Sequence, residues 1–222
     1  MTLPHVIIAL ILGAVAGPPR LDQASDQGVA AAVGGLQRRY QSVRTISGKF
    51  TQIYRAPGVE QIESGILSMK KPGLMRWEYR EPEVKLFVAD GRSTYLYTPE
   101  DRQVLVRPLS DADLRSTPLQ FLLGQGDVSK SFSASWEKEV TPRIEGTLVL
   151  RLTPQTTQPD YAFLVLELDQ LTFELRRLVI RELTANTSEF ILTDLATNVK
   201  LEDGQFKFKI PKGVEVVHVE DK

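Results

Sequence analysis

The fold is decided by the stretch KPGLMRWEY, residues 71–79. Its apolar residues Met75, Trp77 and Tyr79 fall at every second position, which gives a β-strand one apolar face. The chain has only two histidines and no cysteine, so few residue types suited to catalysis accompany this surface. The combination suggests a surface that holds an apolar ligand.

A hairpin follows this strand. Asp90-Gly91 lies between the apolar run 86–89 and the run 95–97, a pattern typical of two antiparallel strands joined by a primed turn. Further strands are predicted on both sides, separated by Pro and Gly residues that end a ladder or reverse the chain. The expected strands are 47–54, 62–70, 74–79, 85–89, 93–97, 104–107, 132–136, 147–153, 163–169, 173–181, 189–194 and 205–210.

The later strands are as one-sided as the first. Their opposite faces carry polar residues such as Arg151, Glu167 and Lys207. The pattern predicts one large sheet with a polar and an apolar face, which must curl or be covered. The apolar residues that share a face are Leu148, Leu150 and Leu152, then Leu164, Leu166 and Leu168, then Phe206, Phe208 and Ile210.

Two helices are expected to cover that face. The first begins at Ser25 or Asp26, either of which can cap it. A second, short apolar helix is predicted after Thr117-Pro118, with proline at its first position. An apolar stripe with helical spacing runs along the first helix through Val29, Val33, Leu36, Tyr40 and Val43. Ordinary core packing is the competing interpretation of that stripe.

The N-terminal region indicates export. Residues 5–17 are uncharged and apolar and end in Ala14-Val15-Ala16, so residues 1–17 are predicted to be a signal peptide, although no Lys or Arg precedes them. Residues 18–27 are predicted to be a mobile leader, and residues 28–222 a single domain. The mature protein is expected to be periplasmic and soluble, since it has no cysteine that could carry a lipid anchor.

Composition excludes several classes of function. The formal net charge is −1 and basic residues form no concentrated patch, so a nucleic-acid partner is not expected. A Ser-His-Asp hydrolase is not expected from two histidines, one of them in the signal segment, and no metal-ligand spacing or phosphate loop is present. We therefore predict no enzymatic activity, no catalytic residues, no metal and no cofactor.

Several segments together resemble the periplasmic lipoprotein carriers of the Lol system, the LolA-like proteins. The resemblance spans about residues 36–217 and depends on the order and spacing of its motifs. The matching segments are ISGKFTQ at 46–52, GIL at 65–67, KKPGLMRWEY at 70–79, VADG at 88–91, YLYTP at 95–99, TPL at 117–119 and FKFKIPKGVEV at 206–216.

The resemblance implies a mainly β (α+β) fold, an unclosed antiparallel β-barrel or half-barrel of about 11 strands with an α-helical lid over an apolar concave face. It also implies a carrier that shields the acyl chains of lipoproteins in an apolar cavity and ferries them from the inner to the outer membrane. The implied partners are acylated lipoproteins, an inner-membrane lipoprotein-releasing transporter and an outer-membrane receptor. The carrier is expected to be a monomer.

Site residues follow from this expectation. Many family members carry Arg before the proline of the KPG motif, where it is thought to bond the lid helix; this chain has Lys71, the candidate lid latch, although Lys70 or Arg76 could substitute for it. For Lys71 the alternative assignment is an ordinary surface charge, and for every cavity residue it is ordinary core packing. The predicted lipid-binding cavity consists of Tyr40, Val43, Phe50, Leu67, Met69, Met75, Trp77, Tyr95, Tyr97, Phe121 and Leu122.

Two other functions remain open at this point. The same half-barrel could carry free lipids or glycolipids, which sequence does not distinguish from lipoproteins. It could also serve as a lipid-responsive periplasmic regulator, although such proteins usually add a second domain and none is expected after Val217.

Overall fold

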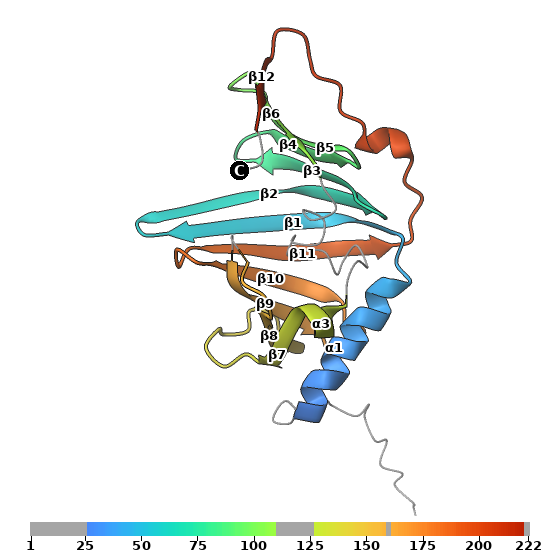
Figure 1. The fold of residues 1–222 in the computed structure, drawn as a ribbon, viewed down its shortest axis with the longest axis vertical. Coiled ribbons are helices and arrows are strands. Elements are labelled where there is room, and N and C mark those ends of the chain that lie inside the picture. Colours follow the sequence, from blue (N-terminus) through green and yellow to red (C-terminus); the bar gives the residue numbers. More distant parts are fainter. Residues whose placement is uncertain (1–25, 110–126, 159–160, 220–222) are drawn as a thin grey trace, which may run out of the picture.

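The computed structural model describes residues 26–109, 127–158 and 161–219 (Figure 1). The expected class, a mainly β half-barrel with a helix over it, is confirmed. The elements are α1 (Asp26–Gln41), β1 (Thr45–Ala56), β2 (Val59–Lys70), β3 (Leu74–Glu81), β4 (Lys85–Asp90), β5 (Ser93–Thr98), β6 (Gln103–Pro108), α3 (Val128–Ser131), β7 (Phe132–Trp136), β8 (Thr147–Pro154), β9 (Tyr161–Asp169), β10 (Leu175–Glu182), β11 (Thr187–Thr197), the 3-10 helix η1 (Asp203–Phe206) and β12 (Glu215–His218). The predicted signal peptide and leader lie outside the described residues, apart from the leader's last two positions, which begin α1.

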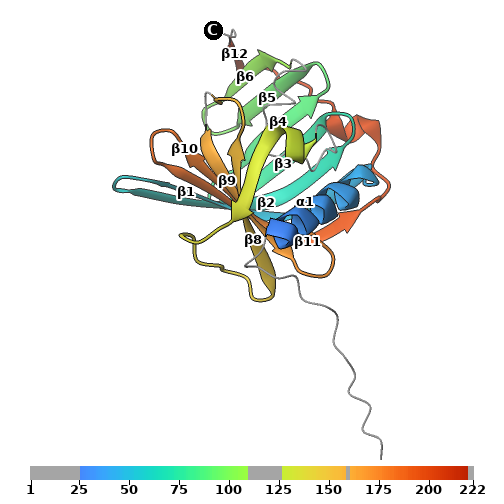
Figure 2. The same cartoon turned by 60° about the horizontal axis from the view of Figure 1, so that its bottom comes forward.

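All twelve strands of the described residues belong to one sheet. Their order is β12-β6-β5-β4-β3-β2-β1-β11-β10-β9-β8-β7, and the pairs are antiparallel except for β12, which runs parallel to β6. The sheet curves around α1 and stays open between its edge strands β7 and β12 (Figure 2). We call the face that α1 covers the concave face and the opposite one the outer face.

Helix α1 forms where the apolar stripe predicts it. Its first turn carries Asp26 and its last turn Arg38 and Arg39, charges that complement the helix dipole at each end. The stripe is buried, and so are Gly28, Ala32 and Gly35 beside it. The helix ends at Gln41, two residues before the last member of the stripe, and the chain then enters β1 at Thr45.

The concave face holds the main core. Leucines of β8 and β9 meet across the ladder, for example Leu148 opposite Leu168 and Leu150 opposite Leu166, and all are fully buried. These leucines and the stripe of α1 belong to the same apolar cluster, which continues through β1, β2 and β3. The apolar face predicted from the alternating strands is therefore the one that the helix covers.

The outer face differs from the polar face that the sequence predicts. Val149, Val165 and Val179 form a second buried cluster on it, against which Val140 packs from the segment between β7 and β8. Beside these valines the buried guanidinium of Arg177 pairs with Glu167 and Glu189. A sheet face can thus be covered by connecting segments as well as by a helix layer.

One predicted strand is absent, and another begins two residues later than predicted. Residues 205–210 alternate Phe and Lys but form no strand; they belong to η1 and to an irregular segment in which Phe206 is buried. The last strand is instead β12, which begins at Glu215, nine positions after the end of η1 at Phe206. The strand expected from Phe173 begins at Leu175, because Phe173 has a positive φ of 56° in the turn before it.

Candidate functional site

Five of the predicted cavity residues lie together on the concave face. Strand pairing places Leu67 opposite Trp77 and Met69 opposite Met75, while Phe50 lies opposite Gly65 on the same side. Opposed residues of an antiparallel pair point to the same face. The ladder therefore gathers side chains from β1, β2 and β3 into one apolar surface.

Aromatic rings at the centre of this surface meet edge to face. The ring centroid of Phe50 lies 4.8 Å from that of Trp77 and 4.9 Å from that of Tyr79, and the centroid of Trp77 lies 5.6 Å from that of Phe190. Gly65 makes room for the cluster, since a Cβ at that position would lie 2.9 Å from the Phe50 ring and 1.9 Å from the carbonyl oxygen of Glu78. The predicted cavity set omits Tyr79, although it alternates with Trp77, and Phe190, which only the pairing of β11 with β1 brings here.

The surface is closed in this structure. Phe50, Leu67, Met69, Met75 and Trp77 are each at most 6% exposed. Solvent scarcely reaches them because they contact each other and belong to the cluster that includes α1. An acyl chain can reach these side chains only if the covering elements move away.

The helix is fixed to the β10 end of the concave face. The Tyr40 hydroxyl accepts a hydrogen bond of 3.1 Å from the backbone N–H of Leu175, and burial raises the pKa of Tyr40. Arg39 pairs with Glu174 and donates to the carbonyl of Thr172. Tyr40 and Val43 are both buried, so these two predicted lid residues lie beneath the helix and its C-terminal extension.

Lys71 binds the C-terminal end of α1. Its Nζ donates to the carbonyl oxygen of Tyr40 at 2.6 Å and to that of Gln41 at 3.2 Å. Burial, with a contribution from the nearby charge of Arg44, lowers the pKa of Lys71 below its ordinary value. The last carbonyls of a helix have no intrahelical partner, so a lysine at this point satisfies them and complements the helix dipole.

Tyr95 and Tyr97, which were predicted to line the cavity, lie on the opposite face of the sheet. Leu96 pairs with Phe87 and Phe87 with Trp77, so Leu96 faces the concave side and its two neighbours face the outer side. There both tyrosine rings contact Phe208, with centroids 5.4 and 5.7 Å apart. The two other lid residues in the prediction, Phe121 and Leu122, lie outside the described residues.

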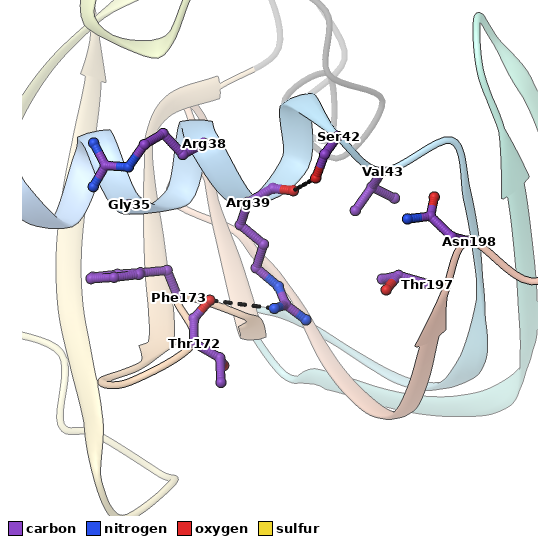
Figure 3. A pocket seen from close by; sticks show the side chains of 9 residues that line it. All are labelled: Gly35, Arg38, Arg39, Ser42, Val43, Thr172, Phe173, Thr197 and Asn198. Carbon is purple, nitrogen blue, oxygen red and sulfur yellow. Dashed lines mark hydrogen bonds between the residues drawn. The ribbon is translucent and has the colours of Figure 1, made fainter.

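A pocket of about 380 Å³ lies beside α1, between the helix and the turn that holds Thr172 and Phe173 (Figure 3). The Arg39 side chain crosses it from the helix toward Thr172, and its buried Nε has no hydrogen-bond partner. Thr197 and Asn198 close the other end, next to Val43. The pocket leaves space along one flank of the helix.

Two features are absent from the described ranges 26–109, 127–158 and 161–219. No group of three or more His, Asp or Glu side chains is placed there to hold a metal ion. No helix in the same ranges has the length and apolar character needed to span a bilayer.

Comparison with known proteins gives a consistent result. Residues 41–209 match the family model described as outer membrane lipoprotein carrier protein LolA. An outer-membrane lipoprotein carrier protein of Cupriavidus taiwanensis is 31% identical over 193 residues, covering 85% of this chain and 88% of that protein. One of Hahella chejuensis is 28% identical over 200 residues, covering 89% and 93%.

A solved structure shows the same fold. An uncharacterized conserved protein of Thermus thermophilus superimposes with a TM-score of 0.52 at 15% sequence identity. The match covers 86% of this chain and 98% of that one.

Proposed function

The chain belongs to the LolA family of outer membrane lipoprotein carriers, and from this premise we propose that it carries lipoproteins with their acyl chains bound between α1 and the concave face. The curated relatives are named for this activity and match over most of both chains. The observation that carries the proposal is the buried apolar surface under a helix whose C-terminal end is bonded by Lys71.

The need for such a surface follows from the cargo. Each CH₂ group that leaves an apolar phase for water costs about 0.8 kcal/mol, so acyl chains cannot cross an aqueous compartment exposed. In the empty carrier the aromatic cluster and the helix bury the same surface that the chains need. Binding therefore exchanges protein contacts for lipid contacts, which keeps the net affinity low enough for release.

The proposed cycle has two partners besides the cargo. An inner-membrane lipoprotein-releasing transporter loads the carrier, and an outer-membrane receptor unloads it. We propose that the carrier works as a monomer in the periplasm after removal of residues 1–17. Loading requires α1 to separate from β2 and β3, because Lys71 joins the helix to the turn between these strands.

The test is mass spectrometry of lipoproteins and lipids that co-purify with the protein from its native periplasm. Acylated lipoproteins are expected. If free lipids or glycolipids co-purify in their place, the cargo is one of these lipids and not a lipoprotein. If no acylated molecule co-purifies, the proposed carrier function is contradicted.

A further inference from the structure

Four polar side chains interrupt the apolar concave face beside the aromatic cluster. The ladder pairs Gln52 with Glu63 and Tyr79 with Lys85. Gln52 follows Phe50 and Tyr79 follows Trp77 at the strand period of two, so all four share the face of those rings. They occupy the end of the face that lies away from Lys71.

These groups bond to one another in the closed carrier. The Tyr79 hydroxyl donates to Oε1 of Gln52 at 2.8 Å. The ammonium of Lys85 pairs with Glu63 and lies 5.0 Å from the centre of the Tyr79 ring. The side chains of Glu63 and Lys85 are only 9% and 20% exposed, so the ion pair is largely removed from water.

Stability alone gives a poor account of this cluster. Removing two charges from water offsets most of their attraction, and apolar residues of similar size in such positions are often as stable. The surrounding face is apolar and could accommodate apolar residues at these four positions. Burial and the nearby charge of Glu63 raise the pKa of Tyr79 to about 12, so its hydroxyl keeps its proton and remains a donor.

The cargo has a matching requirement. An acyl chain ends in an ester or amide carbonyl, which loses its bonds to water when the carrier covers it. A buried carbonyl without a donor is penalised, and a closed apolar surface offers none. A carrier that takes in the whole chain therefore needs donors where the chain ends.

We propose that Gln52, Tyr79 and Lys85 form the polar end of the acyl site and donate hydrogen bonds to the ester or amide carbonyls of the cargo, while Glu63 holds the ammonium of Lys85 in place. This inference rests on the proposed carrier function. It adds that the carrier also recognises the polar groups at the ends of the cargo's acyl chains. An ammonium has three donors, so Lys85 can hold Glu63 and a carbonyl at once. The Tyr79 hydroxyl turns from Gln52 to a second carbonyl.

The experiment compares two ligands on the mature full-length protein. One is a synthetic triacylated lipopeptide, and the other is the same peptide with ether-linked alkyl chains that lack carbonyls. For Tyr79→Phe we expect the Kd of the acyl form to rise about fivefold, which corresponds to one net hydrogen bond, and the Kd of the ether form to stay unchanged. Tyr97→Phe, which removes a hydroxyl on the outer face, is the matched control and should change neither.

A second variant avoids leaving a buried charge unpaired. Glu63→Leu combined with Lys85→Met removes both ions together and should likewise weaken only the acyl form. Equal effects on both ligands in the two variants would overturn the polar-end assignment while leaving the carrier function intact. A wild-type protein that binds neither ligand would instead contradict the carrier function itself.

Discussion

Lys71 joins the β2–β3 turn to the C-terminal end of α1. Its backbone N–H donates to the carbonyl of Arg44 and its Nζ to the carbonyls of Tyr40 and Gln41, so the β2–β3 turn is bonded to the end of α1. Hydrogen bonds from a charged donor contribute about 1.5–3 kcal/mol each when buried, and less at a half-exposed site such as this one. These bonds therefore contribute a few kcal/mol at most to holding α1 in its closed position.

Replacing Lys71 tests this role. Without the latch the closed empty state loses about 1.4 kcal/mol, so Lys71→Leu should bind lipopeptide about tenfold more tightly and deliver it more slowly to the receptor. Ligand titration and transfer kinetics measure the two effects. Lys70→Leu is the control, because Lys70 bonds Asp203 and the carbonyl of Leu201 on the outer face. Unchanged affinity and delivery in Lys71→Leu would remove this residue from the mechanism.

The two faces of the sheet give a second test at the level of single residues. Met75→Gln puts an amide into the buried concave surface, which should lower the free energy of unfolding by about 1–3 kcal/mol and weaken lipopeptide binding roughly tenfold. Tyr97→Gln removes the contact with Phe208 on the outer face, so it should lower stability but leave binding unchanged. Denaturant unfolding and ligand titration separate these effects, and equal binding losses would contradict the face assignment.

Single-residue roles were only partly accessible from the sequence. The alternation of Met75 and Trp77 identifies one face, and the resemblance to lipoprotein carriers identifies Lys71. Tyr95 and Tyr97 alternate equally well, but period-two spacing does not say which of the two faces is concave; only the pairing through Leu96 and Phe87 decides it. The polar end of the site was missed because Glu63 and Lys85 are brought together by the register, 22 positions apart.

At the scale of elements, α1 is held more firmly at its β10 side than at Lys71. Gly35 lies directly on the Phe173 ring, and a Cβ at this glycine would come within 2.5 Å of that ring. Tyr40 and Arg39 add polar contacts to the same turn and strand. The described contacts therefore join α1 to the Phe173 turn and β10 through packing and polar bonds, and to the β2–β3 turn through Lys71.

Substitutions at two neighbouring glycines separate the effect of the Phe173 contact on stability from the effect of helix propensity. Gly35→Ala should lower the free energy of unfolding by about 1–3 kcal/mol because the Phe173 ring must move. Gly34→Ala should raise it by about 0.5–1 kcal/mol, since its Cβ would meet only the flexible end of Arg38 at 3.1 Å. Thermal and denaturant unfolding give both values. A stabilising Gly35→Ala would show that the ring does not seat the helix.

The ionic cluster on the outer face predicts an acid sensitivity. Burial acts to raise the pKa of Glu189, but hydrogen bonds from Arg55 and Arg177 and the charge of Arg143 outweigh it, and the net pKa lies below the ordinary 4.5. A carboxyl with a lowered pKa in the folded protein stabilises above its unfolded pKa, and this contribution is lost as pH falls.

Unfolding experiments between pH 7 and pH 3 measure this contribution. Glu189→Gln should lower stability at pH 7 by about 2 kcal/mol and flatten its decline below about pH 4.5. Glu60→Gln changes a carboxylate that also binds Arg55 but is 53% exposed, so it should affect both quantities little. An unchanged acid slope in Glu189→Gln would contradict the assignment.

The elements themselves were largely predictable, with one instructive failure. Strands with strict alternation and a helix with a complete stripe appear where their periodicities place them. The run from Phe206 to Ile210 has the same alternation, yet the buried Phe206 and the contacts of Phe208 are made by an irregular segment crossing the outer face. Alternation can therefore come from a segment that lies on a sheet, in which Phe206 is buried and Phe208 is partly covered while Ile210 is exposed.

At the scale of the whole molecule, different segments of the chain cover the two faces of the curved sheet. The outer face is closed by connecting segments, charge pairs and the C-terminal stretch that Lys70 and Arg76 bind. The concave face is closed by a helix whose two sides are fastened unequally. Family membership names the cargo, and the proposed carrier function requires the covered concave surface to become accessible during loading.

The position of bound acyl chains is the most direct test of the account. The chain has two tryptophans, so Trp136→Phe leaves Trp77 as the only one, at the centre of the concave aromatic cluster. A lipopeptide with a nitroxide on its acyl chain should quench Trp77 fluorescence at one-to-one saturation. A tryptophan placed on the outer face by Tyr97→Trp, with both native tryptophans changed to Phe, should not be quenched. Saturable binding that leaves Trp77 fluorescence unchanged, or that quenches the outer-face reporter equally, would contradict binding beneath α1.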